Sequence, residues 1–431
     1  MLNKIKGKFN TEEKKSLLSN FFSLTALQMV NYILPLIVIP YLFSTLGAEK
    51  FGLIIFAQAI VMYFGLFINY GFNLSGTREI SIHRENTKKI SEIYSSITII
   101  KLLFLFIAFI VFILMVFSFD KFSGDWKLYL FTFGTLVESI LFPVWFFQGM
   151  ERMKYITIIY TISKIVVTIS IFIVIKSADD YFIVPVLYFI GSLLSGILSV
   201  YILRKLFNVQ LHISSFNQIA DQLKNGWHLF ISNIAINMYR SANILILGFL
   251  TNNLYVGYYA LAEKVIKALQ ALMGPISETL YPYIAKKSSK QNLKSSLVDI
   301  FKIAKYYFVI LAFISSLVIL LAPFGVKILS GSYINNVILD MRILSLVVLF
   351  GGLNYLFGII GLINLGYKKY FMKSVLIAGS VNVILCSILS LYLQDIGAAI
   401  ALSSSELILF LILTNKLYRL KNVEEQNICK N

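Results

Sequence analysis

The residues that could do chemistry in this chain are ionisable side chains inside long apolar segments. The densest group is Arg240 with Glu263, Lys264 and Lys267. Lys264 and Lys267 share one helix face, and Glu263 can reach Lys267 at a spacing of four residues. At 1.5 Å per residue, the group lies about 10 to 18 Å from the outer ends of its segments. Its surplus positive charge favours binding of a phosphate-bearing anion, and the alternative is a network of structural ion pairs.

Three more ionisable residues are candidates for coupling or gating. Glu138 and Lys164 each lie about 16 Å deep in neighbouring segments, by the same helical rise. They either neutralise each other as a buried ion pair or line a cavity and separate during a transport cycle. Glu406, in the middle of the last segment, is either a hydrogen-bonded neutral acid or a group that exchanges a proton and couples transport to the proton gradient. The possible coupling ion of the protein is H+ or Na+.

Uncharged polar residues and one arginine complete the candidate binding set. Gln58, Asn31 and Asn69 either join helices through hydrogen bonds or contact a substrate. Arg78 ends the second apolar segment, where a cation commonly anchors a helix on the cytoplasmic side.

Apolar segments long enough to cross a bilayer position these residues. The chain is 58% apolar and 14% charged, whereas soluble domains are about half apolar and a quarter charged. A spanning helix needs roughly 20 apolar residues, and the continuous runs favour helices over barrel strands. We therefore predict an all-α integral membrane protein with about twelve spans. These lie near 17–44, 50–73, 95–118, 127–148, 155–175, 181–203, 226–248, 255–276, 304–324, 340–365, 370–392 and 396–415.

The distribution of Lys and Arg predicts the orientation. If both termini are cytoplasmic, nearly all basic residues outside the spans face the cytoplasm. The outer segments then hold only Lys50, Lys121, Lys127, Lys176, Lys327 and Arg342. The net charge of +17 thus reflects topology and contact with anionic membrane lipids. No segment is large enough to form a soluble basic surface, so we expect no nucleic-acid partner.

Other features argue against an enzyme, a cofactor or a metal site. The three histidines lack metal-ligand spacing, and Cys386 and Cys429 fall in a span and in the tail. No phosphate-binding loop of the form G-x-x-x-x-G-K-[ST] occurs. Every predicted outer loop is short, which leaves little room for an enzyme that polymerises sugars.

The long loop near 204–225 divides the chain into two six-helix lobes, residues 1–208 and 209–431. FGLIIFAQ (51–58) matches VGYYALAE (256–263), so that Gly52 aligns with Gly257 and Gln58 with Glu263. An even number of spans in each half predicts parallel repeats about an axis along the membrane normal.

Four stretches carry a family resemblance. PYLFSTLGAEKFGLIIFAQ (40–58), NYGFNLSGTREIS (69–81), FPVWFFQGMERMKY (142–155) and LYPYIAKKS (280–288) resemble Wzx-type O-antigen flippases, polysaccharide transporters of the multidrug/oligosaccharidyl-lipid/polysaccharide exporter superfamily. The resemblance implies two lobes around a central cavity in a bacterial inner membrane. It implies transfer of an undecaprenyl-pyrophosphate-linked oligosaccharide to the outer leaflet, with Arg78 as a first contact. Other polysaccharide-assembly proteins are expected partners.

Two other functions remain open at this stage. A multidrug/cation antiporter of the same fold should carry acidic residues in its cavity, whereas the excess here is basic. A membrane polysaccharide polymerase should carry a sizeable outer loop with Arg or His clusters, and the sequence shows none. We therefore expect a flippase that works by alternating access.

Overall fold

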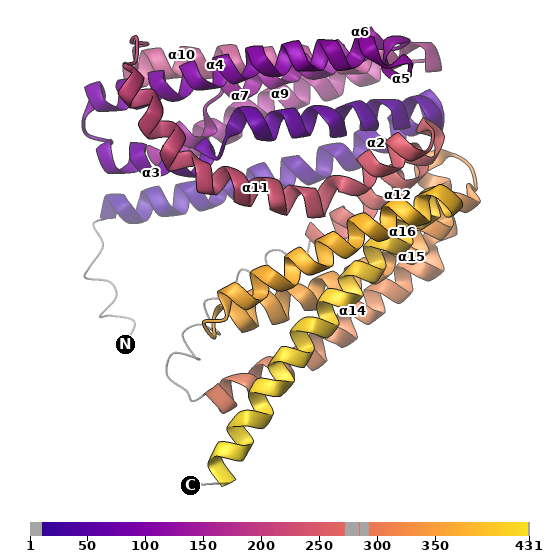
Figure 1. Ribbon diagram of the computed structural model, residues 1–431. Helices are drawn as coiled ribbons and strands as arrows, with labels where there is room; N and C mark the ends of the chain where they lie inside the picture. The colour runs from indigo at the N-terminus through magenta and orange to yellow at the C-terminus, as the bar shows by residue number, and fades with distance from the viewer. Residues whose placement is uncertain (1–10, 272–283, 285–292, 430–431) are drawn as a thin grey trace. The chain divides into compact units, whose positions relative to one another are not determined.

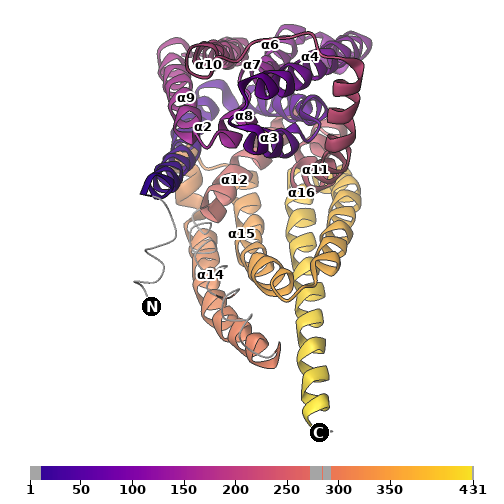
Figure 2. The same ribbon diagram turned by 90° about the vertical axis from the view of Figure 1, so that its left-hand side faces the viewer.

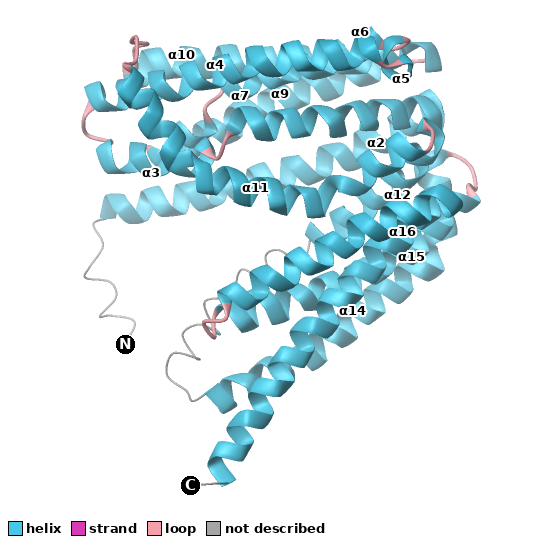
Figure 3. Cartoon of the chain, in the orientation of Figure 1, coloured by secondary structure: helices cyan, strands magenta, loops and turns pink. Residues whose placement is uncertain are grey.

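The computed structural model describes residues 11–271, 284 and 293–429, and the regular elements in these residues are all helical (Figures 1 and 3). Long apolar runs form helices because a helix pairs its own backbone groups inside a bilayer. The elements are α2 Thr11–Asn69, α3 Phe72–His83, α4 Thr87–Ser118, α5 Asp120–Ser123, α6 Trp126–Gly134, η1 Thr135–Val137, α7 Glu138–Leu141, α8 Val144–Gly149, α9 Met153–Val174, η2 Ala178–Phe182, α10 Ile183–Phe207, α11 Phe216–Leu250, α12 Asn253–Ala271, α14 Leu293–Ser330, α15 Asn335–Tyr355, η3 Leu356–Ile363 and α16 Lys368–Cys429.

Eight helices in the described part are long and apolar enough to cross a membrane. Two of them are each a pair of helices joined at a break. Helix α2 has 59 residues and a non-helical Gly47, and α16 has 62 residues and a non-helical Gln394. A straight helix of about 60 residues would measure about 90 Å, three times the hydrocarbon thickness. Both breaks fall in the predicted gaps, 44–50 and 392–396. The all-α membrane class is confirmed, and the number twelve stays a prediction.

The chain forms two compact units. Unit 1 comprises residues 1–38 and 57–234, and unit 2 comprises residues 39–56 and 235–431. Helices α2 and α11 therefore contribute to both units. The division of the sequence at 208/209 stays a prediction about the repeat.

The core of unit 1 is aromatic and gathers where α3, α4 and α8 pack side by side (Figure 2). Trp145 and Phe146 are almost completely buried there. Glycine allows the close approach, because a Cβ on Gly76 would lie 2.7 Å from the Trp145 ring. This close packing against α8 fixes the position of α3, the short helix that carries Arg78.

Unit 2 packs α12, α14, α15 and α16 together with residues 39–56 of α2. The two glycines of the predicted repeat meet at the crossing of α2 and α12. A Cβ on Gly52 would lie 1.8 Å from the Asn253 carbonyl oxygen, and a Cβ on Gly257 would lie 2.0 Å from the Ala48 carbonyl oxygen. Each glycine therefore faces the residue four positions before the other, so the two helices meet through reciprocal contacts between a glycine and a backbone carbonyl.

Candidate functional site

The charged group on α12 contains one ion pair and one further cation. Lys267 Nζ lies 2.9 Å from Glu263 Oε2, at the i,i+4 spacing predicted from the sequence. The Glu263 side chain is 4% exposed, whereas that of Lys267 is 46% exposed. The hydroxyl of Tyr259 also donates to Glu263 Oε1 at 3.5 Å. Glu263 is thus neutralised at the edge of the bundle.

Lys264 supplies the positive charge that remains. It is half-buried on α12, and within the described residues it forms no ion pair. The neighbouring Glu263 already pairs with Lys267, so this turn of α12 keeps one net positive charge. Arg240 lies on α11, and its side chain falls outside the described residues. A half-buried ammonium without a carboxylate partner is suited to attract a phosphate group.

Glu406 has a partner that the sequence did not indicate. Asn354 on α15 donates from its amide nitrogen to Glu406 Oε2 at 2.6 Å and to the Glu406 carbonyl at 2.9 Å. A Cβ on Gly351, one turn earlier, would lie 2.8 Å from Gln270 Nε2 and 3.7 Å from Glu406 Oε2. Gly351 therefore leaves room for two polar side chains from α12 and α16.

Glu138 and Lys164 do not pair with each other. Lys164 Nζ donates to Asn31 Oδ1 of α2, and Ser195 of α10 donates to Glu138 Oε1 at 2.6 Å. The two groups still interact electrostatically within unit 1. Neutral polar partners therefore hold both charges, and the buried ion pair considered from the sequence is not formed.

Lys101 on α4 is a buried cation of unit 1. It is 2% exposed. Its Nζ donates to Asn69 Oδ1 at 2.9 Å and to the Ser139 carbonyl at 3.0 Å. Pro143, four residues after Ser139, has no N–H to donate to that carbonyl. Lys101 therefore takes the place of a missing helix hydrogen bond.

Arg78 and Gln58 stand apart from these groups. Arg78 is exposed on α3, and within the described residues it forms no ion pair. Arg84, which follows it, pairs with Glu151 at 2.9 Å. Gln58 is half-buried on α2. The structure therefore places Arg78 where it is open to an incoming anion.

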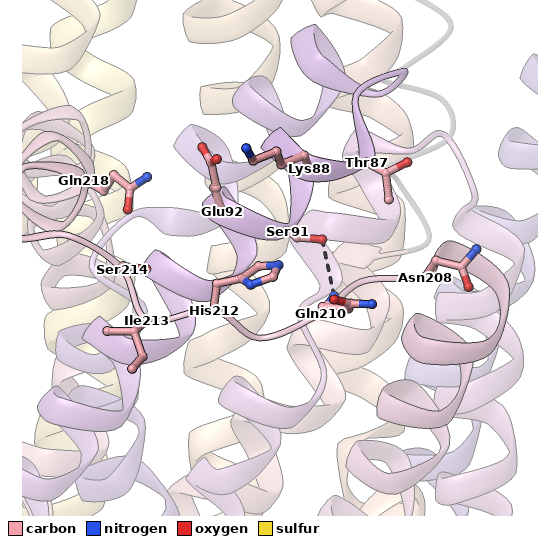
Figure 4. A pocket seen from close by; sticks show the side chains of 10 residues that line it. All are labelled: Thr87, Lys88, Ser91, Glu92, Asn208, Gln210, His212, Ile213, Ser214 and Gln218. Atoms are coloured by element: carbon pink, nitrogen blue, oxygen red, sulfur yellow. Dashed lines mark hydrogen bonds between the residues drawn. The ribbon is translucent and has the colours of Figure 1, made fainter.

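A polar pocket of about 560 Å³ lies where the segment after α10 docks on the start of α4 (Figure 4). Three serines of α4 form hydrogen bonds with this segment. Ser91 accepts from the Gln210 N–H at 3.3 Å, Ser95 accepts from the His212 N–H at 2.9 Å, and Ser96 donates to Ser214 at 2.9 Å. The loop predicted near 204–225 is thus fixed along part of its length. Within the described ranges, no group of three or more His, Cys, Asp or Glu side chains could hold a metal ion.

The fold is that of multi-span membrane transporters. It matches a structure of "Lipid II flippase MurJ, inward closed conformation" with a TM-score of 0.71 and 17% identity, over 94% of this chain and 89% of that chain. It also matches an inward-facing multidrug resistance MATE family transporter of the MOP superfamily with a TM-score of 0.68 and 13% identity, over 94% of this chain and 99% of that one. At such identities the likeness shows the fold.

The sequence comparisons identify the family. The sequence model described as "Polysaccharide biosynthesis protein" matches residues 17–288, and the chain belongs to this family. A relative from Escherichia coli (strain K12), named "Putative O-antigen transporter", is 30% identical over 410 residues, which are 94% of this chain and 98% of the relative. A relative of the same name from Shigella dysenteriae is 33% identical over 269 residues, 62% of this chain and 67% of the relative.

Proposed function

We propose that this chain is a flippase that moves an undecaprenyl-pyrophosphate-linked oligosaccharide, an O-antigen or capsule repeat unit, from the cytoplasmic to the outer leaflet of a bacterial inner membrane. The family match and the names of the relatives support the substrate class. The observation that carries the proposal is the net positive charge on α12, where Lys264 forms no ion pair with any residue that the structure describes. A diphosphate crossing an apolar bundle needs such a cation, because water is not available to solvate it.

The proposed cycle is alternating access with both termini in the cytoplasm. Exposed Arg78 attracts the pyrophosphate first, because its planar guanidinium can bind two phosphate oxygens at once. Lys264, Lys267 and Arg240 bind the pyrophosphate next, while the isoprenoid tail stays in lipid. Gln58, Asn31 and Glu263 are proposed as further substrate contacts. The Glu138–Lys164 group and Glu406 are proposed gating or coupling groups, and H+ or Na+ is the proposed coupling ion.

The test is complementation of a strain that lacks its own flippase. Lys264→Ala should abolish surface polysaccharide at a normal protein level, while Lys264→Arg should retain part of it because the charge stays. Lys368→Ala removes an exposed lysine at the start of α16 and is the matched control. Full surface polysaccharide in Lys264→Ala would contradict the proposal.

The assay also separates the rival functions. A flippase mutant retains single repeat units on the cytoplasmic leaflet, whereas loss of a polymerase leaves single units displayed at the surface. Drug susceptibility that changes with expression, with unchanged polysaccharide, would instead indicate a multidrug/cation antiporter, which shares this fold.

A further inference from the structure

Two buried carboxyl groups of unit 2 have no place in the cycle proposed above. Asp340 lies near the start of α15, and Asp395 directly follows the break of α16 at Gln394. Both residues are 0% exposed. Their carboxyl groups lie within hydrogen-bond reach of each other. The sequence did not indicate this pair, since Asp340 begins one predicted span (340–365) and Asp395 lies just before another (396–415).

The two carboxyl groups differ in their partners. Asn336 donates its amide to both oxygens of Asp395, at 3.1 and 3.0 Å. Asp395 therefore has a neutral polar partner on α15. By contrast, neither carboxyl oxygen of Asp340 has a donor within the described part of the chain. Asp340 is therefore a fully buried acid that faces another acid.

Among the described residues of the surrounding helices, no cation forms an ion pair with either aspartate. From α12, the phenols of Tyr258 and Tyr259 are the groups that interact with Asp395 and Asp340. On α15, exposed Arg342 donates to the Ile319 carbonyl of α14 at 3.3 Å. Within the described residues, neither aspartate takes part in an ion pair.

The last basic residue of α14, Lys327, does not pair with either aspartate in the described part of the chain. Its Nζ lies 5.1 Å from the centroid of the Tyr333 ring. The acids therefore face neutral groups and each other.

The charge of the two carboxyl groups and the number of their free oxygens indicate which ion the pair can bind. Two ionised carboxylates in contact, away from water, repel each other strongly, and one proton between them removes the repulsion. A divalent ion such as Ca²⁺ needs six to eight oxygen ligands. The two aspartates supply four oxygens, and both oxygens of Asp395 already accept from Asn336. A proton is therefore the occupant that the available ligands fit.

We propose that Asp340 and Asp395 bind a single proton between their carboxyl groups and that loss of this proton drives a step of the transport cycle, an inference that rests on the proposed flippase function. Loss of the proton breaks one O–H bond of a carboxyl group and forms one O–H bond on water, which becomes hydronium, so no electrons are transferred. Exposed Asn335 and Leu393 lie close to the pair along the chain, which places the surface nearby. Deprotonation would place two like charges between α15 and α16, and their repulsion would separate the two helices there.

The direct test is infrared difference spectroscopy of the purified full-length protein in lipid nanodiscs. The wild type minus Asp340→Asn spectrum should show the band of one protonated carboxyl group, which disappears as the pH is raised. Asp395→Asn should lose the same band, and asparagine keeps the size of the side chain at that position. Exposed Asp120 is the matched control, and Asp120→Asn should keep the band. An unchanged band in both Asp340→Asn and Asp395→Asn would overturn the proposal.

Two further readouts separate the possible failures. Adding NaCl or CaCl₂ at constant pH should leave the band in place, and its loss would show that the pair binds a metal cation instead. In the complementation strain, Asp340→Asn should lose surface polysaccharide while Asp120→Asn keeps it. If Asp340→Asn loses the band but keeps polysaccharide, the coupling role is overturned. If the wild type itself fails to restore polysaccharide, the proposed function fails, whatever the spectra show.

Discussion

At the scale of single residues, the charges of this protein differ in how they are neutralised. Lys267 has a carboxylate partner, Lys164 has an amide and Lys101 has an amide and a carbonyl. Lys264 forms no ion pair within the described residues. A cation that already donates hydrogen bonds to neutral polar groups has a structural role, whereas a cation without such partners can bind a ligand. This difference makes Lys264 the first residue to test for binding.

The Glu263–Lys267 pair gives a prediction about stability. Lys267→Met should destabilise the protein by about 1–3 kcal/mol, because it leaves the buried Glu263 carboxylate without its cation. The half-exposed position of Lys267 keeps the effect below that of a fully buried pair. The double variant Glu263→Gln/Lys267→Met should recover most of the loss. Thermal unfolding in detergent measures both, and a double variant no more stable than Lys267→Met would argue against the pair.

Lys101 gives a second prediction. Lys101→Met keeps the length of the side chain but leaves the Ser139 carbonyl and the Asn69 amide oxygen without their donor. The expected cost is about 1–3 kcal/mol, as for unsatisfied buried polar groups. Lys368→Met, at an exposed site, is the control and should unfold at the wild-type temperature. Equal unfolding temperatures for the two variants would show that Lys101 is not the structural partner of the break at Pro143.

The sequence could predict which residues are charged inside the membrane, but not their partners. The i,i+4 contact of Glu263 with Lys267 was predictable because both residues lie on one helix. The Asn354–Glu406 and Lys164–Asn31 contacts were not, since each joins helices far apart in the sequence. Asp340 and Asp395 were missed for the same reason, because only the packing of α15 against α16 brings them together.

At the scale of elements, the crossing of α2 and α12 depends on two glycines. A Cβ on either glycine would meet a backbone oxygen, which cannot move aside as a flexible side chain can. Gly52→Ala and Gly257→Ala should therefore each force the helices apart and lower the yield of folded protein. Gly124→Ala is the matched control, because a Cβ there meets nothing within 4 Å. Fluorescence-detected size-exclusion chromatography measures the folded fraction, and a wild-type profile for both variants would contradict this role.

Element boundaries show where sequence reasoning succeeds and where it fails. Long apolar runs predicted the breaks at Gly47 and Gln394, because polar residues interrupt hydrophobicity there. The fourth predicted span, 127–148, is divided into α6, η1, α7 and α8. Hydropathy does not detect the division because the whole segment is apolar, whereas Pro143 indicates a kink at this point of the sequence.

At the scale of the whole molecule, the predicted repeat would relate the two halves of the sequence. The match between residues 51–58 and 256–263 is short, and nearly all of both segments lies in unit 2. Gly52 and Gly257 make reciprocal close contacts there, and the repeat itself stays a prediction. A fold built from repeats can change the access of a central site when its two units move against each other. The proposed alternating access therefore fits the family to which the chain belongs.

The charge bias gives a prediction for the whole chain, because it predicts the side of the membrane on which every loop lies. In a variant with Cys386 and Cys429 replaced by Ala, single cysteines can be placed at exposed positions. Gly124→Cys and Ser332→Cys should react with a membrane-impermeant thiol reagent on cells whose outer membrane has been permeabilised.

Cysteines on the opposite side provide the matched comparison. Glu85→Cys and Lys368→Cys should react only after the inner membrane is opened. The inverse pattern would place both termini outside and reverse the proposed direction of transport. A mixed pattern, with Gly124→Cys labelled and Ser332→Cys protected, would mean that an odd number of spans separates the two positions. Such a result would contradict the predicted twelve, since that count places six spans between residues 124 and 332.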